Sequence, residues 1–300
     1  IECMQECPIV DTPLSQLTEL FPDLNAIVVG VSRQGRLFVP RSADQLQAGD
    51  LAYVVAAKEH VRRTLGLFGH DEEEATRIII AGGGNIGRFV ARTIEERKGR
   101  TRVKIIEPDP ERAAVAADEL NHTVVLQGSA LDQKLLLEAG VDEADLMITL
   151  TNDDQVNILA GVMAKRLGCK ADMALLNNPA YHDFTDILGV DSFINPRAVT
   201  ISRILQHVRR GRIRAVHSVQ QGAAEVIEAE ALETSPLIGK PLRELDLPDG
   251  MRFGAVLRGD NVLRPDGALT VKPKDRIIIF AKPEVVHQVE QMFRVSLEFF

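Results

Sequence analysis

Cysteine, long apolar runs and excess positive charge are all scarce in this sequence. Only Cys3, Cys7 and Cys169 occur, with no Cys-x-x-Cys spacing, which excludes a disulfide framework and predicts reduced thiols. Cys3 and Cys7 could give a metal ion two ligands, but no nearby Cys or His pair completes a site. No apolar run reaches the length of about 18 residues that spans a membrane, and the start lacks the plan of a signal peptide. We therefore expect a cytoplasmic chain with no direct membrane insertion.

The charge balance argues against a nucleic-acid partner. The 43 acidic and 35 basic residues give a formal net charge of −8, so nucleic acid would have to bind a local basic patch against the overall field. The one basic cluster, at 209–214, is equally typical of a helix C-terminus. The length of 300 residues and the hydrophobic fraction of 45% indicate a globular protein of about two domains. Because the chain begins with Ile1 rather than Met, we expect it to be a fragment of a longer chain.

A glycine-rich stretch follows four apolar residues at 78–81, which are typical of a strand buried on both faces. The stretch reads Gly82-x-Gly84-x-x-Gly87. In a dinucleotide-binding turn, the first glycine permits a tight turn, the second lets the backbone approach a pyrophosphate, and the third allows close packing of helix on strand. The N–H groups of the helix that follows would then face the phosphates.

The context strengthens this interpretation. After the glycines, Ile86, Phe89, Val90 and Ile94 recur with helical spacing and lie on one face. The strand at 103–106 then ends at Glu107, where the fingerprint has an acid for the ribose hydroxyls. The same carboxylate argues against NADP, because a 2′-phosphate about 4 Å away would be repelled by about 4 kcal/mol at an effective dielectric near 20.

Strands and helices alternate from residue 77 to about residue 210. This order predicts an α/β fold, a Rossmann-type doubly wound parallel sheet. The expected strands are Arg77–Ala81, Val103–Ile106, Val124–Leu126, Leu146–Thr149, Met173–Leu176 and Ser192–Ile194. The expected helices are Ile86–Glu96, Glu111–Leu120, Gln133–Ala139, Gln155–Leu167, Tyr181–Leu188 and Arg197–Arg209.

The regions on either side of this sheet repeat one another. From Thr12 to Phe68 we expect a small α+β module, with strands at 26–31 and 51–56 and a helix at 58–68. At one constant offset, Arg33 aligns with Arg258, Pro40 with Pro265, Asp50 with Asp275 and the strand at 51–56 with 276–281. Upstream, Thr12-Pro13-Leu14 aligns with Ser235-Pro236-Leu237 at a slightly shorter offset.

The repeat predicts two small α+β C-lobes that flank one nucleotide-binding N-lobe. The predicted domains are a C-lobe of a preceding, truncated unit at 1–68, a linker at 69–76, the N-lobe at 77–211 and a second C-lobe at 212–300. If each C-lobe follows an N-lobe, the intact protein is a tandem pair.

This arrangement resembles the regulator-of-potassium-conductance domains of TrkA-type subunits of bacterial potassium uptake systems. The resemblance rests on Gly82–Gly87, Val103–Glu107 and Thr151–Asn157 and on the duplicated C-lobe. It implies a homo-oligomeric gating ring that lies on the inner face of the cell membrane, beneath a potassium-translocating subunit. It also implies a response to NAD(H) or to ATP and ADP. The residues expected to hold the nucleotide are Gly82, Gly83, Gly84, Asn85, Ile86, Gly87, Glu107, Ser129, Ala130, Thr151, Asn152 and Asp153.

Some of these residues have a second interpretation. Asn152 and Asp153 precede a predicted helix and could simply cap it, although ligands also bind at the carboxyl ends of parallel strands. We interpret Asp109 as a helix start and Arg112 as a surface charge. The histidines have no spacing suited to metal binding or catalysis, and we expect them to be structural or exposed: His122, His182, His207 and His217.

A dehydrogenase is the main alternative, because the same fingerprint serves hydride transfer. Such an enzyme needs a substrate domain with a general acid or base, usually His, Lys or Tyr. The second C-lobe repeats the first and offers only His217 and His287, neither in a polar cluster. We therefore expect a ligand-gated switch and no enzymatic activity.

Overall fold

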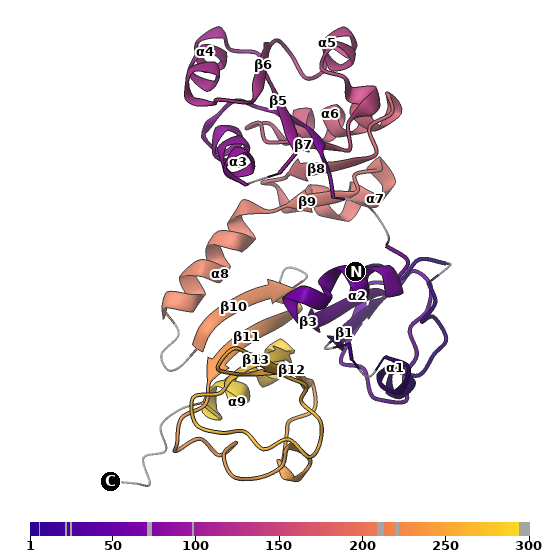
Figure 1. Ribbon diagram of the computed structural model, residues 1–300, viewed down its shortest axis with the longest axis vertical. Helices are drawn as coiled ribbons and strands as arrows, with labels where there is room; N and C mark the ends of the chain where they lie inside the picture. The colour runs from indigo at the N-terminus through magenta and orange to yellow at the C-terminus, as the bar shows by residue number, and fades with distance from the viewer. Residues whose placement is uncertain are drawn as a thin grey trace. The chain divides into compact units, whose positions relative to one another are not determined.

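The fold is that of a computed structural model, which describes residues 1–5, 7–21, 23–24, 26–70, 74–97, 99–208, 213–219 and 222–293. The chain forms two units, Glu73–Arg197 and the combination of Ile1–Glu72 with Ala198–Phe300 (Figure 1). These limits differ from the domain boundaries expected from the sequence, which stay predictions. No helix of the described residues is long and apolar enough to cross a membrane.

A parallel sheet of six strands forms the middle of the unit Glu73–Arg197. The strands pair in the order β6-β5-β4-β7-β8-β9, with every pair parallel. This order confirms the predicted doubly wound sheet, in which the first strand lies at the centre and ligands bind beyond the carboxyl ends of the strands. The strands are β4 (Arg77–Ala81), β5 (Arg102–Glu107), β6 (Val124–Gln127), β7 (Leu146–Thr149), β8 (Ala171–Leu175) and β9 (Ser192–Ile194).

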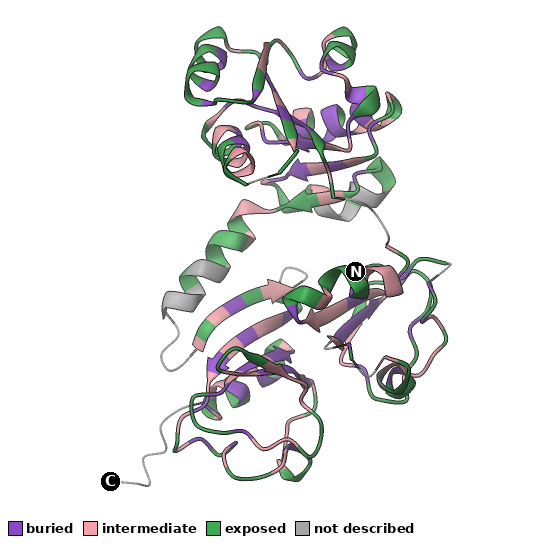
Figure 2. Ribbon diagram, viewed as in Figure 1, coloured by how far each residue is buried: buried purple, intermediate pink, exposed green. Residues whose placement is uncertain are grey.

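Helices cover both faces of this sheet. On one face α3 packs on Ile80 and Ile105 through Ala91, and on the other α5 and α6 pack on Met147 through Leu136 and Ala160. The buried residues of the unit accordingly gather along the central strands (Figure 2). The helices of this unit are α3 (Asn85–Glu96), α4 (Pro110–Glu119), α5 (Gln133–Glu138), η2 (Val141–Glu143), α6 (Asp154–Arg166), η3 (Pro179–Phe184) and α7 (Thr185–Leu188). Helix α8 (Pro196–Val208) follows β9 and belongs, from Ala198 on, to the other unit.

The predicted helices agree with these bounds within a residue or two, with one difference. The segment expected as a single helix over 181–188 forms the 3₁₀ helix η3 and then the short α7. The end expected for α8, Arg209, and most of the basic cluster at 209–214 lie outside the described residues.

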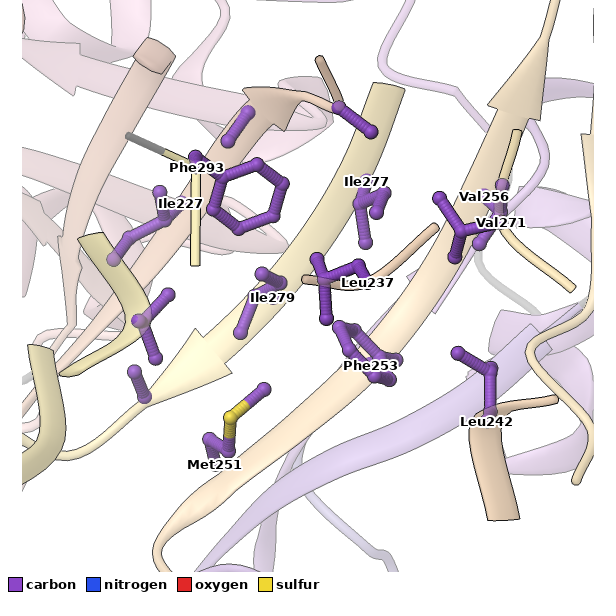
Figure 3. Packing of buried hydrophobic residues seen from close by; sticks show 14 of the residues in the cluster. Ile227, Leu237, Leu242, Met251, Phe253, Val256, Val271, Ile277, Ile279 and Phe293 are labelled. Carbon is purple, nitrogen blue, oxygen red and sulfur yellow. The ribbon is translucent and has the colours of Figure 1, made fainter. Parts of the chain in front are cut away.

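The second C-lobe is an antiparallel sheet with a helix packed on it. Its five strands pair in the order β10-β11-β14-β12-β13. Apolar side chains from β11, β12 and β14 meet Phe293 and Leu237 in one core, which Figure 3 shows. The elements are β10 (Ile213–Val219), β11 (Ala224–Glu230), η5 (Leu242–Glu244), β12 (Met251–Arg258), β13 (Asn261–Leu263), β14 (Arg276–Ala281) and α9 (Pro283–Gln291).

The first C-lobe contains a smaller sheet, in the order β2-β1-β3. Residues 14–20, for which no helix was predicted within the first α+β module, form helix α1, because Leu14, Leu17 and Phe21 recur with helical spacing and pack into the core. The elements are α1 (Leu14–Leu20), β1 (Ala26–Arg33), β2 (Arg36–Phe38), β3 (Leu51–Ala56), η1 (Lys58–His60) and α2 (Val61–Leu67).

An Arg–Asp pair occupies the same place in both lobes. Arg33 donates to both carboxylate oxygens of Asp50 at 2.8 and 2.7 Å, and Arg258 does so to Asp275 at 2.9 and 2.8 Å. The two aspartates are buried and also accept one backbone N–H each. These matched contacts confirm the predicted sequence alignment of the two lobes from β1 and β12 onward.

Upstream of that strand, the sequence alignment of the copies is wrong. The bridge between Pro13 and Gln45 recurs between Pro241 and Thr270. The Leu14 N–H donates to the backbone carbonyl of Asp44, just as the Leu242 N–H donates to the backbone carbonyl of Leu269. Thr12-Pro13-Leu14 therefore corresponds to residues 240–242 and not to 235–237. The Ser-Pro-Leu match is a chance similarity, because the segments that pair with residues 13–14 and 241–242, at 44–45 and 269–270, establish the true correspondence.

The two lobes pack on each other through equivalent strands. β1 and β12 each carry a bulge at the same position, occupied by Val29 in the first lobe and Gly254 in the second. A Cβ on Gly254 would lie 2.5 Å from Val55 Cγ2 and 3.2 Å from Val29 Cγ1. The bulge residues therefore meet near a local pseudo-two-fold axis. The lobes differ in side-chain size at this contact, because the fully buried Phe280 is the counterpart of the smaller Val55.

Candidate functional site

The turn between β4 and α3 needs glycine at two positions for reasons internal to the fold. Gly82 has a φ of +108°, and a Cβ there would lie 3.0 Å from the Leu150 carbonyl group. A Cβ on Gly87 would lie 1.9 Å from the Gly82 carbonyl oxygen. A tight turn and close packing of helix on strand are the roles that the fingerprint gives to these two glycines.

Gly84 is different, because the fold itself does not require a glycine there. Its φ is −68°, and no atom of the described residues lies within 4 Å of the position of a Cβ. Gly84 is the N-cap residue of α3, and no side chain caps that helix. By contrast, Asp109, Asp132 and Asp153 cap α4, α5 and α6 with their carboxylates. The first N–H groups of α3 therefore face open space that suits an anion.

Glu107 ties the glycine turn to the end of β5. Its carboxylate is 3% exposed and accepts the Gly83 N–H at 2.6 Å and the Asp109 N–H at 3.1 Å. Two backbone contacts leave lone pairs on both oxygens for further donors. Asp109 caps α4 through the Arg112 N–H, which confirms its interpretation as a helix start.

The loop after β7 is held from beneath by Asn157, which is fully buried. Asn157 accepts the N–H and hydroxyl of Thr151 at 2.9 and 2.7 Å, and donates to the carbonyls of Thr151 and Leu175 at 3.0 and 2.8 Å. Asp153 caps α6 through two backbone N–H groups, which confirms the capping interpretation. Ligand contact by Asn152 and Asp153 stays a prediction.

These segments line a cleft of about 380 Å³ at the carboxyl edge of the sheet. That size lies within the range of small-molecule sites, roughly 300 to 1,000 Å³. The cleft gathers eight of the predicted residues: Gly82, Gly84, Glu107, Ser129, Ala130, Thr151, Asn152 and Asp153.

Four predicted residues lie beside the cleft and do not line it. Gly83 packs on Glu107, and Gly87 packs beneath the turn. Asn85 and Ile86 are exposed at the start of α3, where only their backbone N–H groups belong to the helix end. Ile86 and Phe89 are 49% and 68% exposed, so only Val90 and Ile94 of the predicted apolar face pack on the core.

Other lining residues were missed by the sequence reasoning, and Arg112 is the most consequential. It is exposed, as expected of a surface charge, and it also lines the cleft from the first turn of α4, where Glu107 lines the cleft as well. The sequence feature that could have indicated this place is the position of Arg112 in the first turn of the helix that follows the strand ending at Glu107. The remaining missed residues are Ile106, Pro108, Leu131, Leu150 and Val156.

The cleft provides binding groups and few groups for catalysis. Its described lining contains no His, Lys, Tyr or Cys, and the described residues form no cluster of three metal-ligating side chains. His122 and His217 are exposed, whereas the side chains of His182 and His207 lie outside the described set. The arrangement can hold an anion at α3 and hydroxyl groups at Glu107.

Two family models match the chain. Residues 78–196 match the TrkA-N domain, and residues 4–69 and 226–294 match the TrkA-C domain. A Trk system potassium uptake protein TrkA from Azorhizobium caulinodans is 54% identical over 298 residues, which are 99% of this chain and 65% of that relative. A protein of the same name from Halomonas elongata is 37% identical over 297 residues, 98% of this chain and 64% of the relative. The chain thus spans a little under two thirds of these curated relatives.

Solved structures resemble the fold more distantly. The crystal structure of the GsuK RCK domain is 19% identical with a TM-score of 0.49, covering 97% of this chain and 62% of that one. The GsuK channel bound to NAD is 17% identical with a TM-score of 0.48, covering 76% of this chain and 41% of that one.

Proposed function

Because the chain belongs to the TrkA family, we propose that it is the nucleotide-binding part of a regulatory subunit that gates a membrane potassium uptake system. The observation that carries the binding step is the uncapped start of α3 above Gly84. A glycine that neither the backbone nor a neighbouring side chain requires is explained by a ligand that approaches the backbone there.

The proposed ligand is NAD(H), or ATP and ADP. The backbone N–H groups at 85–87 would hold the phosphates, and Glu107 would accept the ribose hydroxyls. Arg112 adds a positive charge on the same side of the cleft. The Glu107 carboxylate, fixed by two backbone contacts, cannot turn away from a 2′-phosphate, which supports NAD over NADP.

The proposed assembly is a homo-oligomeric ring docked on the inner face of the membrane, in contact with a potassium-translocating subunit. This part of the proposal rests on the names of the relatives, which are Trk system proteins. A nucleotide can bias such a gate only by binding its two states with different affinity. NADH and ATP must therefore favour different lobe arrangements if they oppose each other.

An NAD-dependent oxidoreductase is the alternative that shares the same fingerprint. The described cleft lining offers carboxylates but none of the His, Lys or Tyr side chains that hydride transfer usually employs. We therefore propose that the chain is not an enzyme. Turnover of NADH or NAD with small alcohols and acids would overturn this point.

Calorimetry with NADH, NAD, NADPH, ATP and ADP tests the binding step. We expect saturable binding of at least one unphosphorylated nucleotide, and NADPH weaker than NADH by at least tenfold. No binding by any of them would refute the site. If binding holds, reconstitution of the full regulatory subunit with a Trk membrane subunit in liposomes tests gating. An equal potassium flux with and without bound nucleotide would refute the regulatory role.

A further inference from the structure

Asp172 is a buried carboxyl group at the amino end of β8, on the opposite edge of the parallel sheet from the nucleotide cleft. It is the second residue of that strand, and its side chain is 0% exposed. The carboxyl group packs directly on the backbone of α6, because a Cβ on Gly161 would lie 2.4 Å from Asp172 Oδ2. Aspartate is almost never fully buried unless its charge is paired. The protonation state of this group therefore needs an explanation.

The two carboxyl oxygens of Asp172 have different surroundings. Oδ1 accepts the Asp191 N–H at 2.9 Å. Oδ2 is inaccessible to solvent and accepts no hydrogen bond from any described residue. An ionised carboxylate can only accept hydrogen bonds, so ionisation would leave negative charge on an oxygen that has no donor. A proton on Oδ2 removes that charge, and burial then costs only what a neutral unpaired hydroxyl group costs.

Three described groups with a charge or an ionisable proton lie near this carboxyl group. Lys165, on α6, has its Nζ 3.9 Å from Asp172 Oδ1, beyond hydrogen-bonding distance, and donates instead to the Gly189 carbonyl at 2.9 Å and to the carboxylate of Asp191. The charge of Asp191 opposes a second negative charge on Asp172. Burial raises the pKa of the Cys169 thiol, which therefore stays neutral. These surroundings favour the protonated form of Asp172.

The same two aspartates join the edge strand β9 to β8. The Asp172 N–H donates to the Asp191 carboxylate at 3.0 Å, in exchange for the Asp191 N–H that reaches Asp172 Oδ1. The Ser192 hydroxyl donates to the Asp172 carbonyl at 3.2 Å. β9 has only three residues and lies at the end of the sheet, so these contacts reinforce a short ladder. Helix α8 follows β9 after one residue and continues into the other unit.

We propose that Asp172 is a proton-binding site, which holds a proton on Oδ2 in the folded chain and controls how firmly β9 pairs with β8. Loss of the proton places two carboxylates side by side at the start of β9, with a single lysine near both.

The direction of the pH dependence follows from the environment of Asp172. Burial and the charge of Asp191 raise the pKa of Asp172 above its ordinary value. The folded chain therefore keeps the proton at pH values at which the unfolded chain has lost it. The stabilisation that this proton gives is fully present below about pH 4 and is lost as the pH rises through the pKa of the folded state. A rise in pH should thus loosen β9 and the segment that leads into α8.

Carbon-13 NMR of the aspartate carboxyl groups, recorded on the whole chain, tests the proton directly. The chemical shift of a carboxyl carbon changes when the group ionises, and the Asp172 signal can be assigned through its backbone. We expect this change at a clearly higher pH than about 3.9, the ordinary pKa of an aspartate side chain. A change at or below that pH would overturn the proposal, because Asp172 would then be an ionised partner of Lys165.

Hydrogen exchange tests the control of β9. Asp172→Asn keeps the shape of the side chain and cannot ionise. The ratio of exchange rates in β9, variant over parent at the same pH, should fall at least threefold from pH 4 to pH 8, because only the parent loses this stabilisation as the pH rises. β6, at the other edge of the sheet, is an internal reference and should show no such fall.

Asp118→Asn is the matched control, because it changes an exposed aspartate on α4. It should leave the exchange rates in β9 within twofold of the parent at every pH. Circular dichroism checks that both variants are folded, and the NMR titration needs no variant. A ratio for Asp172→Asn in β9 that is constant, or that rises with pH, would refute the control of β9 by this proton.

Discussion

Replacement of Gly84 by Asp should abolish nucleotide binding while leaving the fold intact. The backbone of Gly84 already has the extended conformation of an N-cap residue, and a Cβ there meets no described atom within 4 Å. Asp is among the preferred N-cap residues, and Gly is only a few tenths of a kcal/mol worse than the best of them. The free energy of unfolding should therefore be unchanged or slightly raised.

The loss of affinity follows from the position of the new carboxylate. Two unit charges about 4 Å apart repel by about 4 kcal/mol at an effective dielectric near 20, which is a factor of about 10³ in affinity. The Asp side chain would also accept the N–H groups at the second or third position of α3, which the phosphates need. Gly84→Ala, which adds only a methyl group, should cost less.

Calorimetry with the tightest nucleotide measures the affinity, and thermal unfolding without nucleotide measures the fold. Gly99→Asp is the matched control, because a Cβ on Gly99 has no contact nearer than 3.8 Å and this residue lies beyond the C-terminal end of α3, away from its start at Gly84. The control should bind like the parent chain. If Gly84→Asp melts at the parental temperature and still binds within tenfold, the cleft is not the nucleotide site.

Three further outcomes follow from contacts described above. Asn157→Ala removes four hydrogen bonds of a buried amide and should lower the free energy of unfolding in urea by about 2 to 4 kcal/mol. Arg258→Leu leaves the buried Asp275 without its guanidinium partner and should cost about 3 kcal/mol in the same assay; a loss below 1 kcal/mol would contradict the importance of the pair. Lys170 and two backbone N–H groups hold the pKa of Asp145 well below its usual range, so its stabilisation is complete above about pH 5 and is lost as the pH falls further. Asp145→Asn should therefore flatten the decline of stability from about pH 5 to about pH 3, and an unchanged decline would refute this assignment.

The sheet and the glycine turn were predictable because they depend on local pattern. Four apolar residues before the glycines are typical of a buried strand, and the φ of Gly82 and the crowding at Gly87 explain why glycine occurs at these two positions. The alternation of strands and helices likewise predicted a doubly wound parallel sheet, whose strand order the structure then supplies. The sequence repeat aligned the arginines and the aspartates of the two lobes, but it did not show that each arginine contacts the aspartate of its own lobe.

The features that were not predicted from the sequence depend on contacts between distant segments of the chain. Arg112 is exposed as predicted, but nothing in its sequence neighbours indicates that the start of α4 borders the cleft. The alignment upstream of β1 followed a Ser-Pro-Leu match, whereas hydrogen bonds to the loop before β3 decide the true register. Asn157 belongs to the Thr151–Asn157 stretch that carries the resemblance, but its hydrogen bonds to Thr151 and to the distant Leu175, which hold one wall of the cleft, are visible only in the fold.

The contact between bulge residues Val29 and Gly254 has a consequence for how the two copies could diverge. In a symmetric dimer of identical chains, a substitution near the two-fold axis is present in both subunits, so a large side chain or a cation there lies next to the same residue of the other subunit. In a single chain each partner changes alone, and a gain of volume on one side can be matched by a loss on the other, as Val29 is matched by Gly254. The same freedom lets the second copy carry Arg252 at the position where the first copy has Ile27. Covalent linkage has thus turned a self-complementary surface into two surfaces that can specialise separately.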